Sequence, residues 1–128
     1  MYEGEPRVSS PEQMRGRTKE FALRIIKLFR ALPKSEEARV LGRQVLRSGT
    51  AVAANYRSAC RARSRADFAS KIGITVEEAD ETAFWLELIV DAGIVKKSKM
   101  ESLLMEADEL VRIFQASRTT ARRGVEDL

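Results

Sequence analysis

The fold of this chain is decided by one stretch, Arg39–Arg65, which reads RVLGRQVLRSGTAVAANYRSACRARSR. Successive residues of an α-helix are about 100° apart, and at this spacing the stretch divides into two faces. Cations fall on one face, in a stripe made of Arg39, Arg43, Arg47, Arg57 and Arg61. Residues suited to a core fall on the opposite face, namely Leu41, Val45, Ser48, Val52, Asn55 and Tyr56. The stretch therefore predicts one helix with a buried face and a basic face, followed by a turn.

The middle of this stretch is unusually small, because Ser48, Gly49, Thr50 and Ala51 follow one another. A glycine in a helix interior costs about 1 kcal/mol relative to alanine. Gly49 is therefore expected where a neighbouring backbone passes very close, or where the helix bends. Asn55, on the core face, is expected to be a buried polar group that needs a hydrogen-bonding partner.

A first helix is predicted before this stretch, over about Thr18–Ala31. Its apolar residues recur at the spacing of one buried helical face, as Phe21, Ile25, Leu28, Phe29 and Leu32. Pro33 ends this helix, because the residue before a proline is disfavoured in the α conformation. Ser35 then provides a good N-cap for the second helix.

Two more helices are predicted after the arginine-rich turn. Ser64, answered by Asp67, caps a third helix that runs to about Asp91. A capping-box pattern at Ser98–Glu101 opens a fourth helix, whose helicity is expected to fade near Ser117–Thr120. Connections of a few residues force antiparallel neighbours. The predicted fold is therefore all-α, an antiparallel up-down-up-down four-helix bundle.

The two ends of the chain are expected to lie outside this bundle. Residues 1–17 contain two prolines, two glycines and two serines, which favour a flexible N-terminal arm. Residues 18–120 form the predicted four-helix bundle. Residues 121–128 form a predicted charged C-terminal tail.

The third helix carries a second apolar face, opposite its core face, made of Ile74, Phe84, Trp85 and Leu88. A monomeric four-helix bundle buries only one face of each helix. These residues therefore predict an oligomer interface. The alternative is that the first helix or the N-terminal arm covers them.

Composition excludes several classes of function. The 128 residues include no histidine and one cysteine, Cys60, so a Ser-His-Asp or Cys-His catalytic arrangement cannot be built. The usual zinc ligand sets are missing as well, and we predict no catalytic residues, no metal and no cofactor. No apolar run approaches the length of a membrane span. We therefore expect a soluble cytoplasmic protein, and a lone cysteine fits a reducing compartment.

The arginine stripe is the first candidate for a function. With Arg63 and Arg65 added from the turn, its guanidinium groups could follow the phosphate backbone of RNA or DNA. The formal net charge of +4 is only mildly basic, and the stripe lacks aromatic residues that would stack on bases. The alternative is that the arginines are solvated or form ion pairs, including pairs between subunits of a structural or protein-interaction module.

An acidic cluster on the third helix is the second candidate, with Glu77, Glu78, Asp80 and Glu81. Di-metal sites in helical bundles combine such glutamates with Glu-x-x-His pairs, and this chain has no histidine. We therefore expect these acids to pair with arginines, within the chain or across a subunit interface.

The run Leu46–Val95 resembles the bacterial four-helix-bundle proteins first noticed in intervening sequences of 23S ribosomal RNA genes. The resemblance covers about residues 18–117. It is carried by Gly73–Glu81 and by a small-residue run, an asparagine and an arginine-rich turn, namely Arg47, Ser48, Gly49, Val52, Ala53, Asn55 and Arg61–Arg65. Where the family often has alanine, glutamate and glycine at the end of this motif, this chain has Tyr56–Ala59.

The resemblance implies an antiparallel four-helix bundle that forms five-membered rings. Proteins similar to this family include the accessory protein of diversity-generating retroelements, a basic ring that binds a reverse transcriptase and nucleic acid. The resemblance therefore implies a homopentamer and lends no support to an enzyme. It also implies RNA or DNA as a partner, with a reverse transcriptase or another protein as a further partner.

Overall fold

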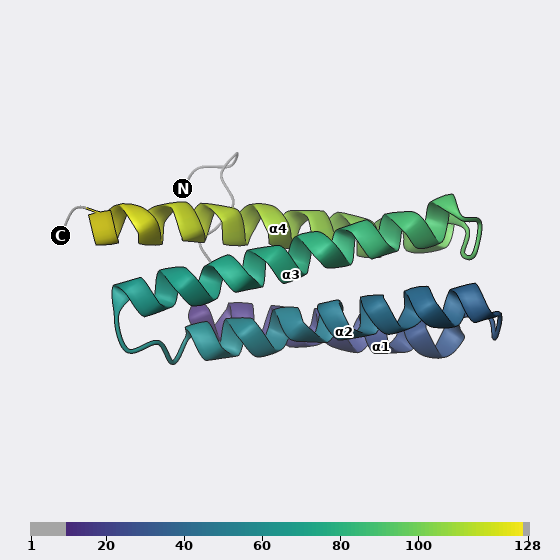
Figure 1. Ribbon diagram of the computed structural model, residues 1–128, viewed down its shortest axis with the longest axis horizontal. Helices are drawn as coiled ribbons and strands as arrows, with labels where there is room; N and C mark the ends of the chain where they lie inside the picture. The colour runs from purple at the N-terminus through teal and green to yellow at the C-terminus, as the bar shows by residue number, and fades with distance from the viewer. Residues whose placement is uncertain (1–9, 127–128) are drawn as a thin grey trace.

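The computed structural model describes residues 10–126, and within them the chain forms four α-helices. They are α1 (Pro11–Ala31), α2 (Glu36–Ala59), α3 (Arg65–Asp91) and α4 (Lys97–Glu126). Successive helices run antiparallel and side by side (Figure 1), which confirms the predicted all-α bundle. None of the described helices has the length and apolar character needed to span a bilayer.

Two of the predicted helix starts are correct because their capping residues act as expected. The hydroxyl of Ser35 accepts the backbone N–H of Ala38 at 3.3 Å, at the start of α2. The hydroxyl of Ser64 accepts the backbone N–H of Asp67 at 3.0 Å, at the start of α3. After α3, Gly93 adopts a φ of 76°, which favours glycine.

The predicted N-terminal arm is wrong for its last residues, because α1 begins at Pro11 rather than near Thr18. Ser10 and Gln13 form a capping box, in which each side chain bonds the backbone of the other residue. Proline is well suited to the first helical position, since the missing N–H has no partner there in any case. Met14 is then buried with only 4% exposure. Residues 1–9 of the predicted arm lie outside the described part of the chain.

The predicted C-terminal tail is also wrong for residues 121–126, because α4 continues to Glu126. Polar residues near the expected end do not break the helix. The hydroxyls of Ser117 and Thr119 bond the carbonyl oxygens of Ile113 and Gln115, at 3.2 and 3.0 Å. These side chains satisfy their own polar atoms within the helix. Residues 127–128 of the predicted tail lie outside the described part.

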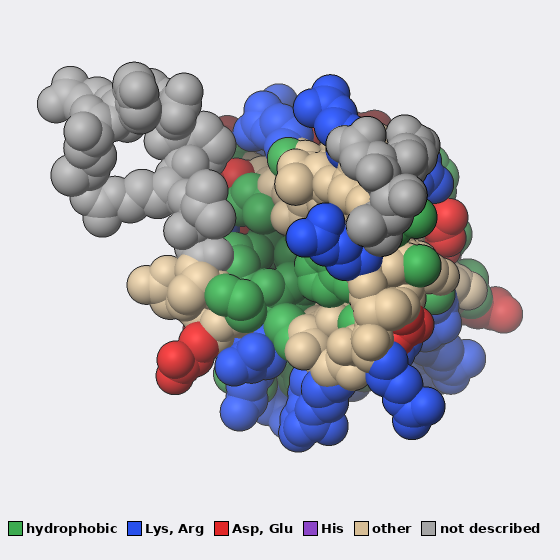
Figure 2. Space-filling model, turned by 90° about the vertical axis from the view of Figure 1, so that its left-hand side faces the viewer, with side chains coloured by type: hydrophobic (Ala, Val, Ile, Leu, Met, Phe, Trp, Pro, Cys, Tyr) green, Lys and Arg blue, Asp and Glu red, His purple; other side chains and the backbone are tan. Residues whose placement is uncertain are grey.

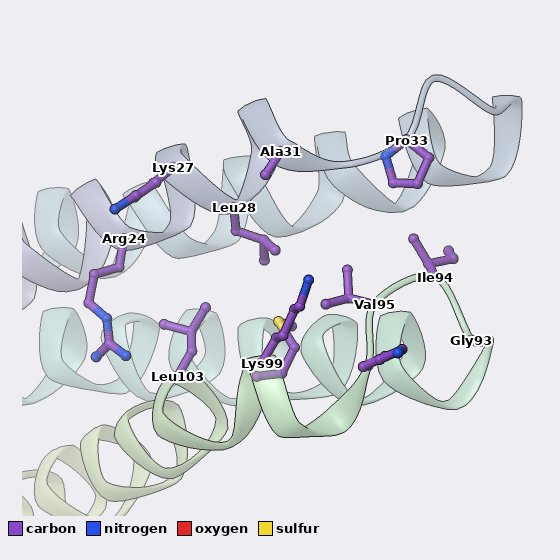
Figure 3. Close-up of a pocket in the computed structure, with 12 residues that line it drawn as sticks. Arg24, Lys27, Leu28, Ala31, Pro33, Gly93, Ile94, Val95, Lys99 and Leu103 are labelled. Atoms are coloured by element: carbon purple, nitrogen blue, oxygen red, sulfur yellow. The ribbon is translucent and has the colours of Figure 1, made fainter.

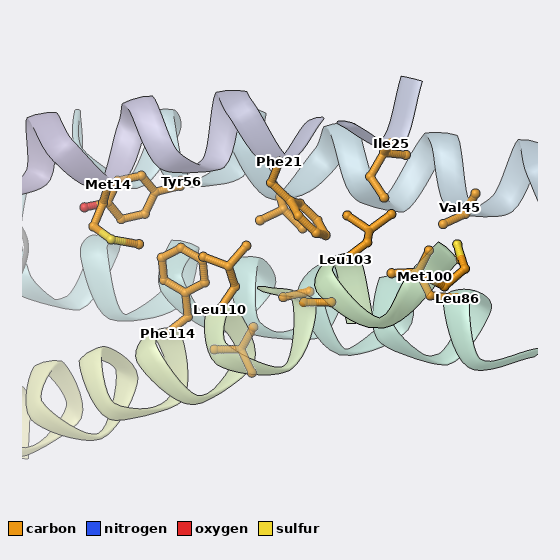
Figure 4. Packing of buried hydrophobic residues seen from close by; sticks show 14 of the residues in the cluster. Met14, Phe21, Ile25, Val45, Tyr56, Leu86, Met100, Leu103, Leu110 and Phe114 are labelled. Carbon is orange, nitrogen blue, oxygen red and sulfur yellow. The ribbon is translucent and has the colours of Figure 1, made fainter. Parts of the chain in front are cut away.

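The core runs along the centre of the bundle and draws on all four helices. In Figure 4, Met14, Tyr56 and Phe114 meet at one end, where the rings of Tyr56 and Phe114 lie 5.2 Å apart. Burial raises the pKa of the Tyr56 hydroxyl. Other residues with less than 2% exposure include Phe21, Ile25, Val45, Leu86, Ile89 and Leu110.

Small residues on α2 allow its two neighbours to approach closely. A β-carbon at Gly49 would lie 2.8 Å from Cγ1 of Ile25, so α1 occupies the space that a side chain would take. On the other side of α2, the hydroxyls of Ser48 and Thr82 form a hydrogen bond of 2.9 Å and are both fully buried. The expectation of close packing at Gly49 is thus correct, although the neighbour is a side chain of α1.

Asn55 does not behave as expected. Its side chain is only partly buried, and its amide donates a 2.9 Å hydrogen bond to the carbonyl oxygen of Ala51 in the same helix. The amide is therefore satisfied within α2 itself.

A charged contact joins α1 to α4. Arg17 donates two hydrogen bonds to the carboxylate of Glu106, at 2.9 and 2.7 Å, and lies 3.0 Å from Glu109. The hydrogen bond from Arg17 lowers the pKa of Glu106, and the same bond raises the pKa of the Arg17 guanidinium. Arg17 belongs to the segment predicted as a flexible arm, yet it ties the first and last helices together.

Substituting Gly49 by alanine should destabilise the protein, by about 1 kcal/mol. The methyl group would overlap Ile25, and overpacking of about 1–3 kcal/mol exceeds the gain in helix propensity. The matched control is Gly16→Ala in α1, where a β-carbon has no neighbour within 4 Å. This control should stabilise the protein by up to about 1 kcal/mol. Urea denaturation measures both changes, and a stable Gly49→Ala variant would contradict the packing described.

Substituting Glu106 by glutamine should destabilise the protein at neutral pH by about 1–2 kcal/mol, since a charge-assisted bond is lost. Because the pKa of Glu106 is lowered in the folded state, its stabilisation is present above the ordinary value of 4.5 and disappears as the pH falls through the folded value. The variant should therefore lose less stability than the parent on acidification below pH 4.5. Thermal denaturation from pH 7 to pH 3 tests this, with exposed Glu101→Gln as control. Parallel curves for the parent and the Glu106→Gln variant would refute it.

Candidate nucleic-acid interface

The outer face of α2 carries three arginines that point away from the bundle. Arg39, Arg43 and Arg57 are all exposed. None of them forms an ion pair with a carboxylate among the described side chains. They are on this face because α2 packs its opposite sides against α1 and α3. Arg39 and Arg57 are about 27 Å apart along the helix axis, from the rise of about 1.5 Å per residue.

Arg47 lies in the predicted stripe but contacts α3 instead of standing free. Its guanidinium donates to Glu78 at 3.1 Å and also bonds Glu81. The indole N–H of Trp85 donates to the same Glu81 carboxylate at 3.1 Å. The hydrogen bond to Glu78 raises the pKa of Arg47 above its ordinary value. The structure therefore separates Arg47, which is paired with α3, from the exposed arginines on either side of it in the predicted stripe.

The acidic cluster on α3 divides in the same way. Glu78 and Glu81 pair with Arg47, as the sequence predicted for acids of this helix. Glu77 and Asp80 are exposed and have no ion-pair partner among the described side chains. No group of three potential metal ligands occurs within the described residues.

The remaining predicted arginines lie at one end of the bundle. Arg61 follows the end of α2, and Arg63 and Arg65 belong to the connection and the first residue of α3. The backbone N–H of Arg63 donates to Asp67 at 3.1 Å, and this bond lowers the pKa of the Asp67 carboxyl. The basic residues after Ala59 are thus held at the end of the bundle and do not extend the α2 helix.

A hollow of about 1040 Å³ opens at this end, where the start of α1, the α2–α3 connection and the last turns of α4 converge. Figure 2 shows apolar side chains at the centre of this end with Lys and Arg side chains around them. Arg63 and Arg65 line the hollow together with Arg15 of α1, and no carboxylate is among the described residues that line it. Sequence reasoning missed Arg15, because its segment was assigned to a flexible arm.

The end hollow also supplies an aromatic residue that the stripe lacks. Phe68 of α3 is partly buried, and it lines the hollow with Arg63 and Arg65. No spacing rule connects these residues with Arg15, since they meet only when α1 and the α2–α3 connection reach the same end of the bundle.

Two of the four residues of the second apolar face predicted on α3 are exposed in the single chain. Phe84 and Ile74 are 51% and 44% exposed, and Trp85 and Leu88 are partly buried. The rings of Phe84 and Trp85 are in edge contact, 5.0 Å apart. Helix α1 packs against α2 and leaves this face uncovered.

Taken together, the fold and the site define a class, the antiparallel four-helix bundles with a basic helix face and an exposed aromatic face. The chain belongs to the 23S rRNA-intervening sequence protein family, whose pattern matches residues 13–116. It is also similar to a solved structure from Bacteroides thetaiotaomicron, a protein with unknown function from the S23 ribosomal protein family. The two chains are 34% identical, the match covers 85% of this chain and 97% of that chain, and the TM-score is 0.78. A comparison with curated proteins gives no match.

Proposed function

We propose that this protein is a non-enzymatic, homo-oligomeric accessory protein that binds nucleic acid through the outer face of α2. One observation carries this proposal. Arg39, Arg43 and Arg57 stand exposed in one line, and none of them is neutralised by a carboxylate among the described side chains. Guanidinium groups in such a line suit the phosphates of RNA or DNA, because each can bond two oxygens of one phosphate.

The chemistry of the face favours binding to the backbone over reading of bases. The face carries Thr50 and Ala54 between the arginines. The Thr50 hydroxyl donates to the carbonyl oxygen of Leu46 at 2.7 Å, so it is already bonded within the helix. Base recognition depends on polar groups that reach base edges. The proposed binding is therefore independent of sequence.

An oligomer would multiply this contact, because each copy brings its own arginines. The exposed Phe84 and Ile74 support an oligomer, since exposed apolar patches mark protein interfaces. The family resemblance favours a homopentamer. It also makes a reverse transcriptase or another protein the natural partner of an assembled ring.

Replacing the exposed arginines should weaken nucleic-acid binding and its dependence on salt. The variant Arg39→Gln/Arg43→Gln/Arg57→Gln should reduce the magnitude of the slope of log affinity against log salt by about 2–3, since each lost phosphate contact removes roughly 0.7–0.9. Fluorescence anisotropy with labelled single-stranded and double-stranded RNA and DNA measures this slope. Arg112→Gln, which removes an exposed arginine of α4, is the control.

Arg47→Gln is a second control within the stripe itself. Because Arg47 is engaged by α3, its loss should change the salt slope much less than the loss of Arg43. Binding that ignores all these substitutions, or that does not respond to salt, would refute the proposed function.

A second candidate is a structural or protein-interaction module whose arginines form ion pairs between subunits. The observation in its favour is that acidic residues lie around Phe84 on α3. Exposed Glu77, Asp80 and Glu87 share its side of α3 by their helical spacing. Arginines on α2 of a neighbouring copy would complement these acids.

Substituting Phe84 by serine should dissociate the proposed oligomer without unfolding the chain, because the ring is half exposed in the single chain. The control is Met105→Ser, which removes another exposed apolar side chain, 71% exposed on α4. Light scattering and sedimentation give the mass of each variant. A monomeric parent, or an unchanged Phe84→Ser assembly, would refute an interface on α3. Assembly lost on substitution of Arg39, Arg43 and Arg57 would favour the second candidate.

A further inference from the structure

A basic groove lies at one end of the bundle, opposite the end that carries the hollow lined by Arg63 and Arg65. It opens between the C-terminal half of α1 and the start of α4, beside the α3–α4 turn (Figure 3). Its volume is about 690 Å³, within the range of about 300–1,000 Å³ typical of small-molecule sites. The lining residues named below all belong to the described part of the chain.

Cations enter this groove from both sides. Arg24 and Lys27 come from α1, and Lys96 and Lys99 come from the α3–α4 turn and α4. Figure 3 shows Lys99 extending from α4 toward α1. No carboxylate is among the described residues that line it. The lysines form no ion pair with any described side chain, and Arg24 only donates to the hydroxyl of Ser102 at 2.9 Å.

The seam between α1 and α4, on which this groove lies, does not carry the same excess of positive charge along its whole length. Further along α1, Arg17 faces Glu106 and Glu109 of α4, and all three groups are paired. The charges of the seam are therefore paired at Arg17, whereas the cations at the groove end have no carboxylate partner among the described side chains. Like charges held around one space repel one another, and an anion in that space would relieve the repulsion.

The floor of the groove is apolar. Leu28, Ile94 and Val95 line it and are only partly buried, and the buried Leu103 lines it as well. An inorganic anion would satisfy the cations but leave this floor in water. A neutral apolar ligand would cover the floor but leave the cations without a partner. The groove is thus complementary to a ligand that has both features.

We propose that this groove binds a small amphipathic organic phosphate, a single soluble alkyl chain with a phosphate head. The alkyl chain covers the floor around Leu28 and Val95. The phosphate lies among Lys27, Lys96 and Lys99, because ammonium groups bind phosphate as point charges from several directions. This site uses no residue of the α2 face, so it does not depend on the proposed nucleic-acid binding.

Calorimetric titration with octyl phosphate tests the site, with octanol and inorganic phosphate as the two halves of the ligand. The parent should bind octyl phosphate at least about tenfold more tightly than either half, since both contributions are needed. Lys99→Gln should weaken binding by about tenfold. Lys97→Gln is the matched control, because Lys97 lies two residues away, is exposed and does not line the groove.

A second variant tests the floor without touching the core. Ala31 is exposed and lines the groove, so Ala31→Trp should fill it and abolish binding while leaving the melting temperature unchanged. Absence of binding to the parent overturns the proposal, as does equal weakening by Lys97→Gln and Lys99→Gln. If inorganic phosphate bound as tightly as octyl phosphate, the groove would be a simple anion site and the proposal would be overturned. Binding to phosphatidylserine vesicles in place of octyl phosphate, or displacement of the ligand by RNA, would assign the groove to another partner and overturn it too.

Discussion

The close contact between Gly49 and Ile25 fixes the position of α2, and the rest of the molecule follows from that position. Helix α1 occupies one flank of α2 through this contact, and α3 occupies another through the buried bond between Ser48 and Thr82. Only the third flank remains for charged residues. The outward direction of Arg43 and its neighbours is therefore a consequence of core packing, and a change in the small residues would turn the basic face as well.

The seam between α1 and α4 is built differently. None of the described glycines brings α1 against α4 as Gly49 brings α2 against α1, and Arg17 of α1 joins Glu106 of α4 by charge-assisted hydrogen bonds. Two helices that meet through long polar side chains lie further apart than two helices that meet at a glycine. This difference explains why the bundle is tight around α2 and why a groove remains at the far end of the α1–α4 seam.

Much of this fold could be predicted from the sequence, because the helical spacing of apolar residues and the serine caps are local signals. The errors were local too. By composition Ser10, Pro11 and Gly16 favour a flexible arm, whereas in order Ser-Pro-x-Gln is a start signal for a helix. The site was less predictable. The pairing of Arg47 depends on where α3 lies, and the basic groove joins residues from opposite halves of the chain, so no spacing in the sequence reveals either one.

The network around Arg47 also gives the molecule an optical reporter of its own. The chain has one tryptophan, Trp85, whose indole bonds the carboxylate that Arg47 holds, and whose ring touches the exposed Phe84. Its emission is therefore sensitive to two separate surfaces, the basic side of α2 and the aromatic side of α3. Binding and assembly can be followed by intrinsic fluorescence on the unmodified protein. Substituting Arg47 or Phe84, the two neighbours of the indole network, would distinguish the two events.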